Sequence, residues 1–203
     1  MNLMGYDAMA LGPLDLALGW EALQQRTAEA DFAMLSANTA LTGTEDLIVD
    51  PYTILDVGGL RVGVVGLTRQ PDTALPTFHI LDPQQAAETY VPQVAEQADT
   101  VILLTNLPYR QAMALAESVP GIDLVVAALP NQLPKQAVRT ANGTLVVTAE
   151  QPLPRHTGRR VGQLVVDVGA DGSLNGETWQ SRALDRSIPD DPEMQALLEK
   201  YKK

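Results

Sequence analysis

Three asparagines are placed where their side chains could bind a ligand. Asn38, Asn106 and Asn131 each follow a short apolar run, at the point where a strand should end. Amides that meet at one edge of a sheet could hold a polar ligand through hydrogen bonds. Asparagine is also typical of loops, which it caps by bonding to nearby backbone groups. Ligand contact and loop capping are therefore alternatives, and the residue type favours capping.

Imidazole groups are few in this chain. Its two histidines are His79 and His156, and an acid–base or metal role for either needs companion residues that the sequence does not supply. We expect His79 to be structural. His156 stands in a loop with three arginines that could grip an anion such as phosphate or could simply be solvated. These arginines are Arg155, Arg159 and Arg160.

Two carboxylates near the start of the chain, Asp7 and Asp15, could bind a hard cation weakly. Separated carboxylates without further ligands are more often a turn residue and a negative charge at a helix N-terminus. We therefore expect these structural roles for both side chains.

The composition excludes several classes of partner. The chain has 203 residues, 45% of them hydrophobic, and a formal net charge of −11. This balance suits one domain with a single sizeable core. The negative charge argues against nucleic acid, because the long-range field repels phosphates. The longest apolar runs have the length of strands, so we expect no direct membrane insertion.

The elements that must position these side chains follow from the hydrophobic pattern. Apolar residues at helical spacing predict a helix over residues 16–33, followed by a buried strand over 32–38. A glycine pair, Gly58-Gly59, separates strands over 52–57 and 60–67 and predicts a hairpin. Residues 82–98 begin with Asp-Pro and predict a helix that is kinked or restarted at Pro92.

The middle of the chain repeats a strand, helix and strand. Residues 100–106, 109–119 and 122–129 predict a parallel β-α-β unit. Strand-like runs over 144–150 and 161–169 make the C-terminal third look antiparallel, so the sheet should be mixed. The last residues, 188–203, predict a short capped helix.

Several motifs in order resemble one family. The segments MNLMGYDAMALG, LSANTA, ADTVILLTN and VPGIDLVVAALPN are similar to successive segments of the 5′-nucleotidase branch of the calcineurin-like metallophosphatases, and the resemblance covers about residues 1–200. It implies an α/β, metallophosphatase-like fold with αββα layers, mixed β-sheets flanked by helices, and incomplete at the N-terminus. Residues 1–185 would form this partial domain, and residues 186–203 a C-terminal helical tail.

The resemblance also implies that metal ligands have been replaced. In active relatives His, Asp and Asn side chains hold two divalent ions that polarise the phosphoryl group. The positions where the family has ligands are occupied here by Pro13, Leu14, Asn106, Leu129 and Asn131. Proline and leucine side chains cannot coordinate a metal. We therefore expect no catalytic residue, no metal site and no cofactor.

Earlier ligands of the family, an Asp-x-His and a further Asp, have no counterpart in this sequence. We expect either upstream sequence or a partner that covers the exposed sheet edge. The first functional hypothesis is a catalytically inactive domain with a structural or protein-interaction role in a larger assembly. The second is a divergent metal-dependent phosphohydrolase with a dimetal centre, completed by upstream sequence or a partner.

A third hypothesis is a module that binds an anion or another small ligand in the old cleft. The contacts would come from Asn38, Asn106, Asn131, His156 and Arg159. We recognise no targeting signal in the sequence, but the family resemblance suggests a periplasmic or extracellular protein.

Overall fold

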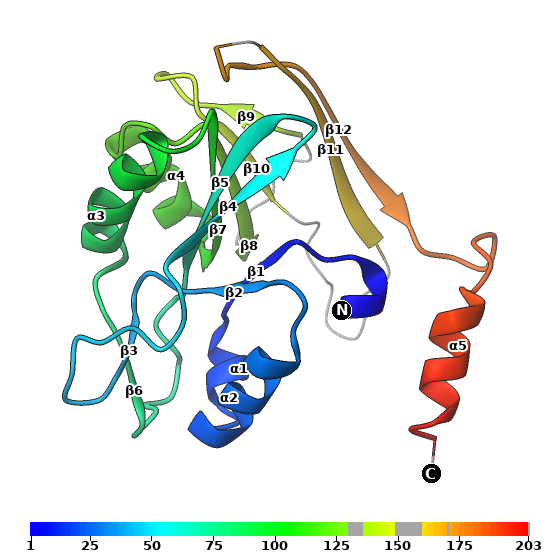
Figure 1. The fold of residues 1–203 in the computed structure, drawn as a ribbon. Coiled ribbons are helices and arrows are strands. Elements are labelled where there is room, and N and C mark those ends of the chain that lie inside the picture. The colour runs from blue at the N-terminus through cyan, green and yellow to red at the C-terminus, as the bar shows by residue number, and fades with distance from the viewer. Residues whose placement is uncertain (130–135, 149–159, 170, 203) are drawn as a thin grey trace.

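The computed structural model describes residues 1–129, 136–148, 160–169 and 171–202. Its central element is a six-stranded sheet with the order β4-β5-β7-β8-β10-β9 (Figure 1). The inner strands run parallel, whereas β4 and β9 run antiparallel to their neighbours. The strands are β4 (Tyr52–Val57), β5 (Leu60–Leu67), β7 (Thr100–Pro108), β8 (Leu124–Leu129), β9 (Val138–Arg139) and β10 (Leu145–Thr148). The mixed α/β fold is therefore confirmed.

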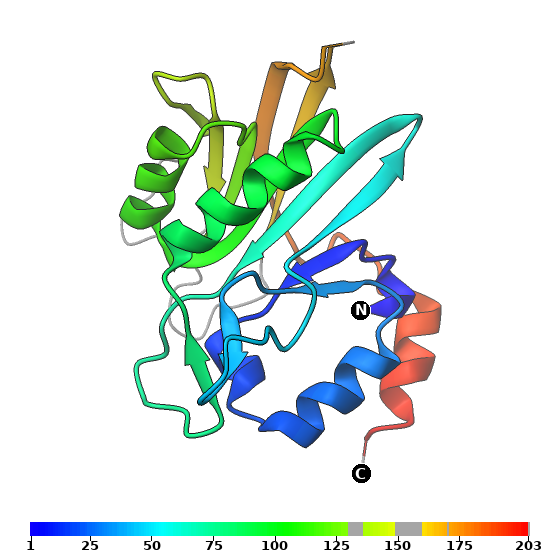
Figure 2. The same cartoon turned by 60° about the vertical axis from the view of Figure 1, so that its left-hand side comes forward.

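Two helices cover one face of this sheet (Figure 2). They are α3 (Pro83–Ala95) and α4 (Tyr109–Ser118). Buried side chains from both, such as Val91 and Leu115, pack with Leu103 of β7 and Val125 of β8 in the largest apolar cluster. The alternating burial along β7 shows which side chains face the helices. The predicted β-α-β unit forms as expected.

The prediction for α3 left two alternatives at Pro92, a kink or a restart. The helix does not restart at Pro92 but runs through it as a single element. Asp82 caps its start, where its Oδ1 accepts hydrogen bonds from the backbone N–H groups of Gln84 and Gln85. Pro92 removes one backbone donor near the end of the helix, and the burial of Val91 and Val94 holds the turn together.

The hairpin β4–β5 has the predicted boundaries. Gly58 and Gly59 form its turn with φ angles of 63° and 89°, a region that residues other than glycine rarely adopt.

The predicted helix over residues 16–33 is wrong in its extent. It is two helices, α1 (Pro13–Leu16) and α2 (Trp20–Glu29), which are separated at Gly19 with φ 86°.

The N-terminal elements form a second apolar cluster below the sheet. A short helix η1 (Asn2–Met4) precedes β1 (Ala8–Ala10), which pairs in parallel with β2 (Ala33–Leu35). A further ladder joins β3 (Thr39–Leu41) to β6 (Phe78–Ile80). Leu11, Leu16, Leu23 and Phe78 are buried together between these segments.

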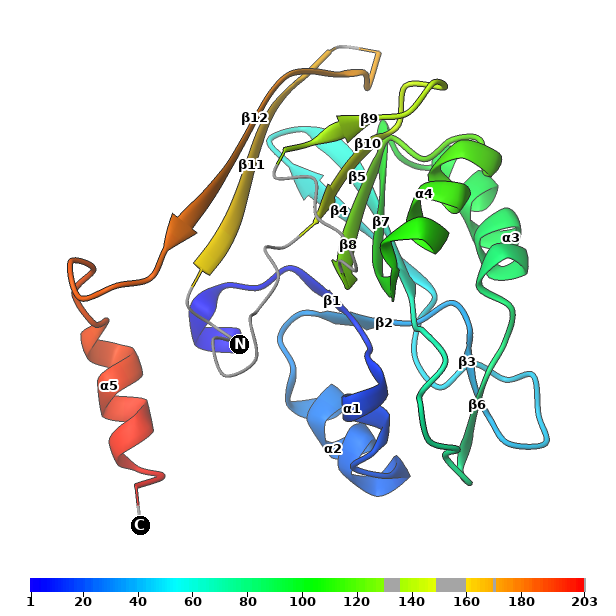
Figure 3. The ribbon, with the colours of Figure 1, turned by 180° about the vertical axis from the view of Figure 1, so that it is seen from behind.

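The C-terminal hairpin lies on the face of the sheet opposite α3 and α4 (Figure 3). It consists of β11 (Arg160–Val168) and β12 (Leu174–Ala183), which pair antiparallel. The antiparallel prediction is wrong for β10, because that strand also pairs in parallel with β8. A separate apolar cluster forms where Leu174 and Trp179 meet Leu145 and Val147.

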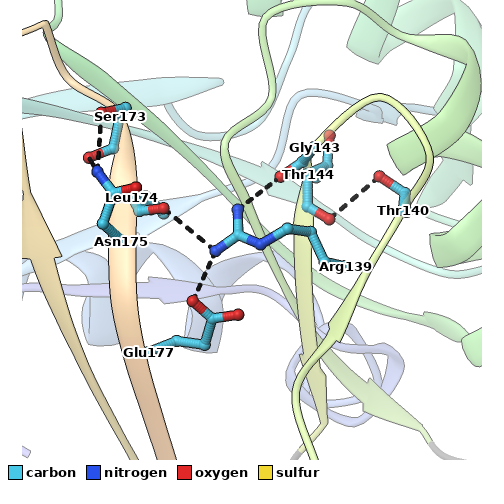
Figure 4. Close-up of polar contacts among 8 residues, drawn as sticks. All are labelled: Arg139, Thr140, Gly143, Thr144, Ser173, Leu174, Asn175 and Glu177. Carbon is cyan, nitrogen blue, oxygen red and sulfur yellow. Dashed lines mark hydrogen bonds and ion pairs between the residues drawn. The ribbon is translucent and has the colours of Figure 1, made fainter.

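A single arginine ties this hairpin to the edge of the central sheet (Figure 4). Arg139 on β9 donates to the backbone carbonyls of Gly143 at 2.8 Å and Leu174 at 3.1 Å, and to Glu177 Oε2 at 2.8 Å. The ion pair holds the pKa of the Glu177 carboxyl below its ordinary value, chiefly through the hydrogen bond from Arg139. The outer strand of the hairpin, β12, is therefore fixed above the β9 edge.

The last helix, α5 (Pro192–Glu199), is capped by Asp191 and has no buried residue. It extends away from the sheet (Figure 1). In the described part of the chain, no helix is long and apolar enough to cross a membrane.

Candidate functional site

The carboxyl ends of β5, β7 and β8 meet at one edge of the sheet, the usual place for a ligand in a parallel α/β arrangement. The loop after β1 lies against this edge. Its Leu11 carbonyl accepts two hydrogen bonds, from Thr68 Oγ1 at 2.9 Å and from Asn106 Nδ2 at 2.6 Å. Segments 57 and 95 residues apart in sequence are thereby joined at one backbone oxygen.

Asn106 uses both ends of its amide to hold backbone groups. Besides donating to Leu11, it accepts a hydrogen bond from the backbone N–H of Arg69, at 2.6 Å from its Oδ1. The side chain thus clamps the loop after β1 to the loop after β5. Both partners are backbone groups, but they belong to residues 37 and 95 positions away rather than to the asparagine's own turn.

Asn38 is more deeply engaged. Its side chain is fully buried, and its Oδ1 accepts from the N–H of Thr68 at 2.8 Å. Its Nδ2 donates to the carbonyls of Thr68 at 2.8 Å and Leu81 at 3.1 Å. Ser36 Oγ lies 2.8 Å from Thr68 Oγ1 and 2.7 Å from Thr39 Oγ1, completing a buried polar cluster. In this conformation Asn38 offers no surface to a ligand.

The loop from Gly12 to Asp15 forms the start of α1. Pro13 is the first helical residue, and Asp15 Oδ2 accepts from the N–H of Gly12 at 2.7 Å. Leu14 instead projects outward and is 84% exposed. Asp15 is thus a capping residue at a helix start, while Asp7 is exposed at the opposite end of β1.

Other candidate residues lie elsewhere. His79 is on β6, paired with Ala40 of β3, and its Nδ1 is buried without a hydrogen-bond partner. Arg160 begins β11, where its guanidinium donates to Ser181 Oγ and to the Ser181 carbonyl, both at 2.8 Å. Leu129 is the last residue of β8. Asn131, Arg155, His156 and Arg159 lie outside the described residues.

The described residues do not fit a dimetal centre. The side chains of Pro13 and Leu14 offer no ligand atoms, Asp15 caps a helix, and both ends of the Asn106 amide are engaged. Within the described ranges there is no group of three or more His, Asp or Glu side chains that could hold a metal ion. No reaction step through such ions can be derived from these residues.

In the described loop after β5, the charge does not favour an anion either. Arg69 is the nearest guanidinium in the loop after β5, and it donates to Asp72 Oδ1 at 3.1 Å and Oδ2 at 3.2 Å. Its charge is therefore paired with a carboxylate. Burial raises the pKa of the Tyr109 phenol at the start of α4, which keeps that group neutral at physiological pH.

A groove of about 420 Å³ opens beside the site, between the start of α3 and α4. Leu81 and Leu107 contribute to its apolar surface, Gln70 and Gln111 to its polar surface. Its lining includes Asp82 and, among the described residues, no lysine or arginine. The described lining of the groove therefore offers no positively charged side chain to an anion.

Sequence reasoning did not identify Thr68 and Arg69 as members of this site. They follow the apolar run of β5 directly, and a polar pair at the end of a predicted central strand was the available signal. No feature of the sequence indicated that the Leu11 carbonyl accepts two hydrogen bonds, because every residue carries a backbone carbonyl.

Comparison with known proteins reveals homology over the whole chain. A 5′-nucleotidase from Bos taurus is 28% identical over 224 aligned positions, covering 100% of this chain and 39% of that protein. The crystal structure of a 5′-nucleotidase precursor from Thermus thermophilus superposes with a TM-score of 0.83 and 28% identity, covering 99% of this chain and 43% of that one. No protein-family model matches the chain.

The fold also matches that of a protein that is not called a 5′-nucleotidase. The sulfate thiohydrolase SoxB from the same genus superposes with a TM-score of 0.84 at 21% identity, covering 98% of this chain and 37% of that chain. This second match bears on the fold alone. The chain is therefore a 5′-nucleotidase-like α/β domain that spans about two fifths of the length of these relatives.

Proposed function

We propose that this chain is a catalytically inactive, metallophosphatase-like domain with a role in protein interaction within a larger assembly. The fold corresponds to a partial αββα arrangement, with residues 1–185 as the domain and residues 186–203 as a helical tail. A periplasmic or extracellular location is part of the same proposal. It rests on the resemblance to exported 5′-nucleotidases.

One observation carries the proposal. Where the family resemblance expects a histidine, Leu14 presents an apolar side chain that is 84% exposed. Leu18 nearby is 64% exposed. An apolar side chain cannot bind an ion or a phosphate, whereas exposed apolar side chains that lie together suit a surface that another protein covers.

The engagement of Asn106 supports the same reading. Its amide joins the loops after β1 and β5, so the residue at a former ligand position has become part of the scaffold. Replacing a metal ligand by a side chain that holds only backbone groups keeps the shape of this edge of the sheet but removes its metal-binding chemistry. Such a change is consistent with a domain retained for its surface.

The experiment is a paired measurement of metal binding and hydrolysis. Titration calorimetry with Mn²⁺ and with Zn²⁺ should show no stoichiometric binding, and incubation with p-nitrophenyl phosphate or AMP should release no phosphate above the blank. The 5′-nucleotidase of Bos taurus serves as the positive control. Stoichiometric binding of two ions together with hydrolysis would replace the proposal with the divergent phosphohydrolase.

A further inference from the structure

The C-terminal helix α5 forms without support from the apolar clusters of the domain. Figures 1 and 3 show it beyond the end of the C-terminal hairpin, away from the central sheet. It has eight residues, none of them buried, and none belongs to the three apolar clusters of the described chain. An isolated helix shorter than about 12 residues is only marginally stable in water. A surface that packs against α5 would therefore stabilise it.

The local sequence specifies this helix clearly. Asp191 Oδ1 accepts a hydrogen bond from the backbone N–H of Met194 at 2.9 Å, and Pro192 is the first helical residue. Gln195 Nε2 donates to Asp190 Oδ2 at 3.1 Å, across the start of the helix. The helical conformation of this segment thus follows from its own residues, whereas its packing partner does not.

One side of α5 and of the turn that follows it carries an apolar stripe. The stripe consists of Met194, Leu197, Leu198 and Tyr201, at the i, i+3, i+4 and i+7 spacing of a single helix face. Leu198 is 54% exposed and Tyr201 is 77% exposed. A hollow of about 600 Å³ lies beside Met194 and Leu198, and all of its lining residues lie between positions 190 and 202. No other described segment of the chain contributes to this hollow.

The two ends of the segment carry opposite charges. Asp190, Asp191 and Glu193 stand at its start, whereas Lys200 and Lys202 stand at its end. If α5 lies antiparallel to α5 of a second copy, the acidic start of each helix faces the basic end of the other. The two-fold axis of such a pair repeats this contact at both ends. A parallel pair would instead place like charges against each other, so the charge pattern favours an antiparallel second copy.

The net charge of the chain opposes self-association, but much less at the tail than elsewhere. The whole chain carries −11, whereas residues 190–203 have four acidic and three basic side chains. Salt at physiological strength screens exposed charges beyond about 8 Å, and pairing through α5 leaves the two domains apart. Helices this short are expected to bury less than the roughly 1,200 Å² of a stable interface. The expected dimer is therefore weak and depends on concentration.

We propose that α5 is a self-association element, which pairs antiparallel with α5 of a second copy of this chain, stripe against stripe and acidic start against basic end. The inference goes beyond the proposed function, because it concerns the tail and not the former metal site. Hydrolysis of p-nitrophenyl phosphate would overturn the proposed function and would leave this inference unchanged.

The first test is sedimentation equilibrium of the whole chain in physiological salt, up to about 1 mM. The average mass should rise from monomer toward dimer. Leu198→Lys places a charge in the stripe and should raise the dissociation constant by at least about tenfold. Ala196→Lys is the matched control, because Ala196 is exposed on the opposite side of the helix, and it should leave the constant unchanged. Neither residue is buried, so both variants should fold as the parent chain does.

Cysteine crosslinking tests the orientation, because the chain has no cysteine of its own. In an antiparallel pair Leu198 lies near the centre, and Met194 lies opposite Tyr201 of the other copy. Leu198→Cys should therefore form a disulfide-linked dimer on mild oxidation. Met194→Cys and Tyr201→Cys should link to each other in a mixture of the two variants, and neither should link efficiently to itself.

A charge exchange tests the pairing of the ends. Glu193 and Lys200 lie on the same flank of the stripe, two helical turns apart, and would face each other across the antiparallel pair. Glu193→Lys alone should weaken association, and the addition of Lys200→Glu should restore it. Sedimentation equilibrium under the same conditions measures both variants.

Four results would overturn the inference. They are a chain that stays monomeric up to about 1 mM, a dimer that Leu198→Lys does not weaken, self-linking of Tyr201→Cys as efficient as that of Leu198→Cys, and a charge exchange that does not restore association. Slow hydrogen exchange in residues 192–199 of the monomer would also contradict it, because it would show that the chain's own domain covers α5.

Discussion

The two faces of the six-stranded sheet are covered in different ways. On one face, α3 and α4 bury Leu103 and Val125 completely in a continuous apolar cluster. On the other, the β1–β2 ladder and the β11–β12 hairpin cover the two sides and leave Leu104 and Val126 partly exposed.

The difference follows from chain connectivity. The closed face is built by consecutive β-α-β units, in which each helix returns over the strand that it has just left. The other face is assembled from segments at the two ends of the sequence, which must be held by long-range contacts such as those of Asn106 and Arg139. Among the described residues, this layer covers Leu104 and Val126 less completely than the helices cover Leu103 and Val125.

The largest effect is expected from truncating matched leucines on the two faces. Leu103→Ala should lower the free energy of unfolding by about 2–5 kcal/mol, because it leaves a cavity in a closed cluster. Leu104→Ala, its neighbour on the other face, should cost about 1 kcal/mol or less. Urea unfolding followed by circular dichroism measures both. Equal losses would mean that Leu104 is as well packed as Leu103 on the closed face.

The second comparison concerns the two asparagine clamps at the site. Asn38→Ala removes three hydrogen bonds from buried backbone groups of Thr68 and Leu81 and should cost about 2–3 kcal/mol. Asn106→Ala, at a partly exposed site, should cost about 1 kcal/mol because water can replace some partners. The same urea titrations measure both. A larger loss for Asn106→Ala would contradict this order.

The third effect is the pH dependence of the C-terminal hairpin. Because Arg139 lowers the pKa of Glu177 in the folded state, the ion pair stabilises the hairpin fully at pH values above the unfolded-state pKa of this carboxyl. This stabilisation is lost as the pH falls through the lower folded-state pKa. Hydrogen exchange in residues 160–168 should therefore speed up in acid relative to β7, after correction for intrinsic exchange rates. In Glu177→Gln this acid-induced change should be reduced. An unchanged pH profile in that variant would show that the ion pair does not hold the hairpin.

The smallest effect is expected from removing the tail. Helix α5 has no buried residue, so a chain that ends at residue 185 should melt within about 2 °C of the full chain. Removal of residues 174–203 is the matched control, because it takes away β12 and should expose the apolar cluster around Leu145. Differential scanning calorimetry measures both. A large fall for the short truncation would make the tail part of the domain.

Much of the closed face could be predicted from the sequence. Gly58-Gly59 and the apolar runs on either side predict β4 and β5 with the observed limits, and the Asp82-Pro83 pair marks the start of α3. These features are local, since turn conformation and capping depend on neighbouring residues. The break at Gly19 was missed although a glycine with a φ angle of 86° is a local feature. The parallel pairing of β10 was missed because it depends on the distant strand β8.

At the site, the sequence by itself determined that the side chains at positions 13 and 14 carry no ligand atom for a metal, because proline and leucine side chains lack one in any conformation. Only the tertiary structure decided what the remaining polar groups do. The amides of Asn38 and Asn106 meet backbone atoms from residues 30 to 95 positions away. Residue type limits the bonds that a side chain can form, but its partners depend on which segments the fold brings within hydrogen-bonding distance.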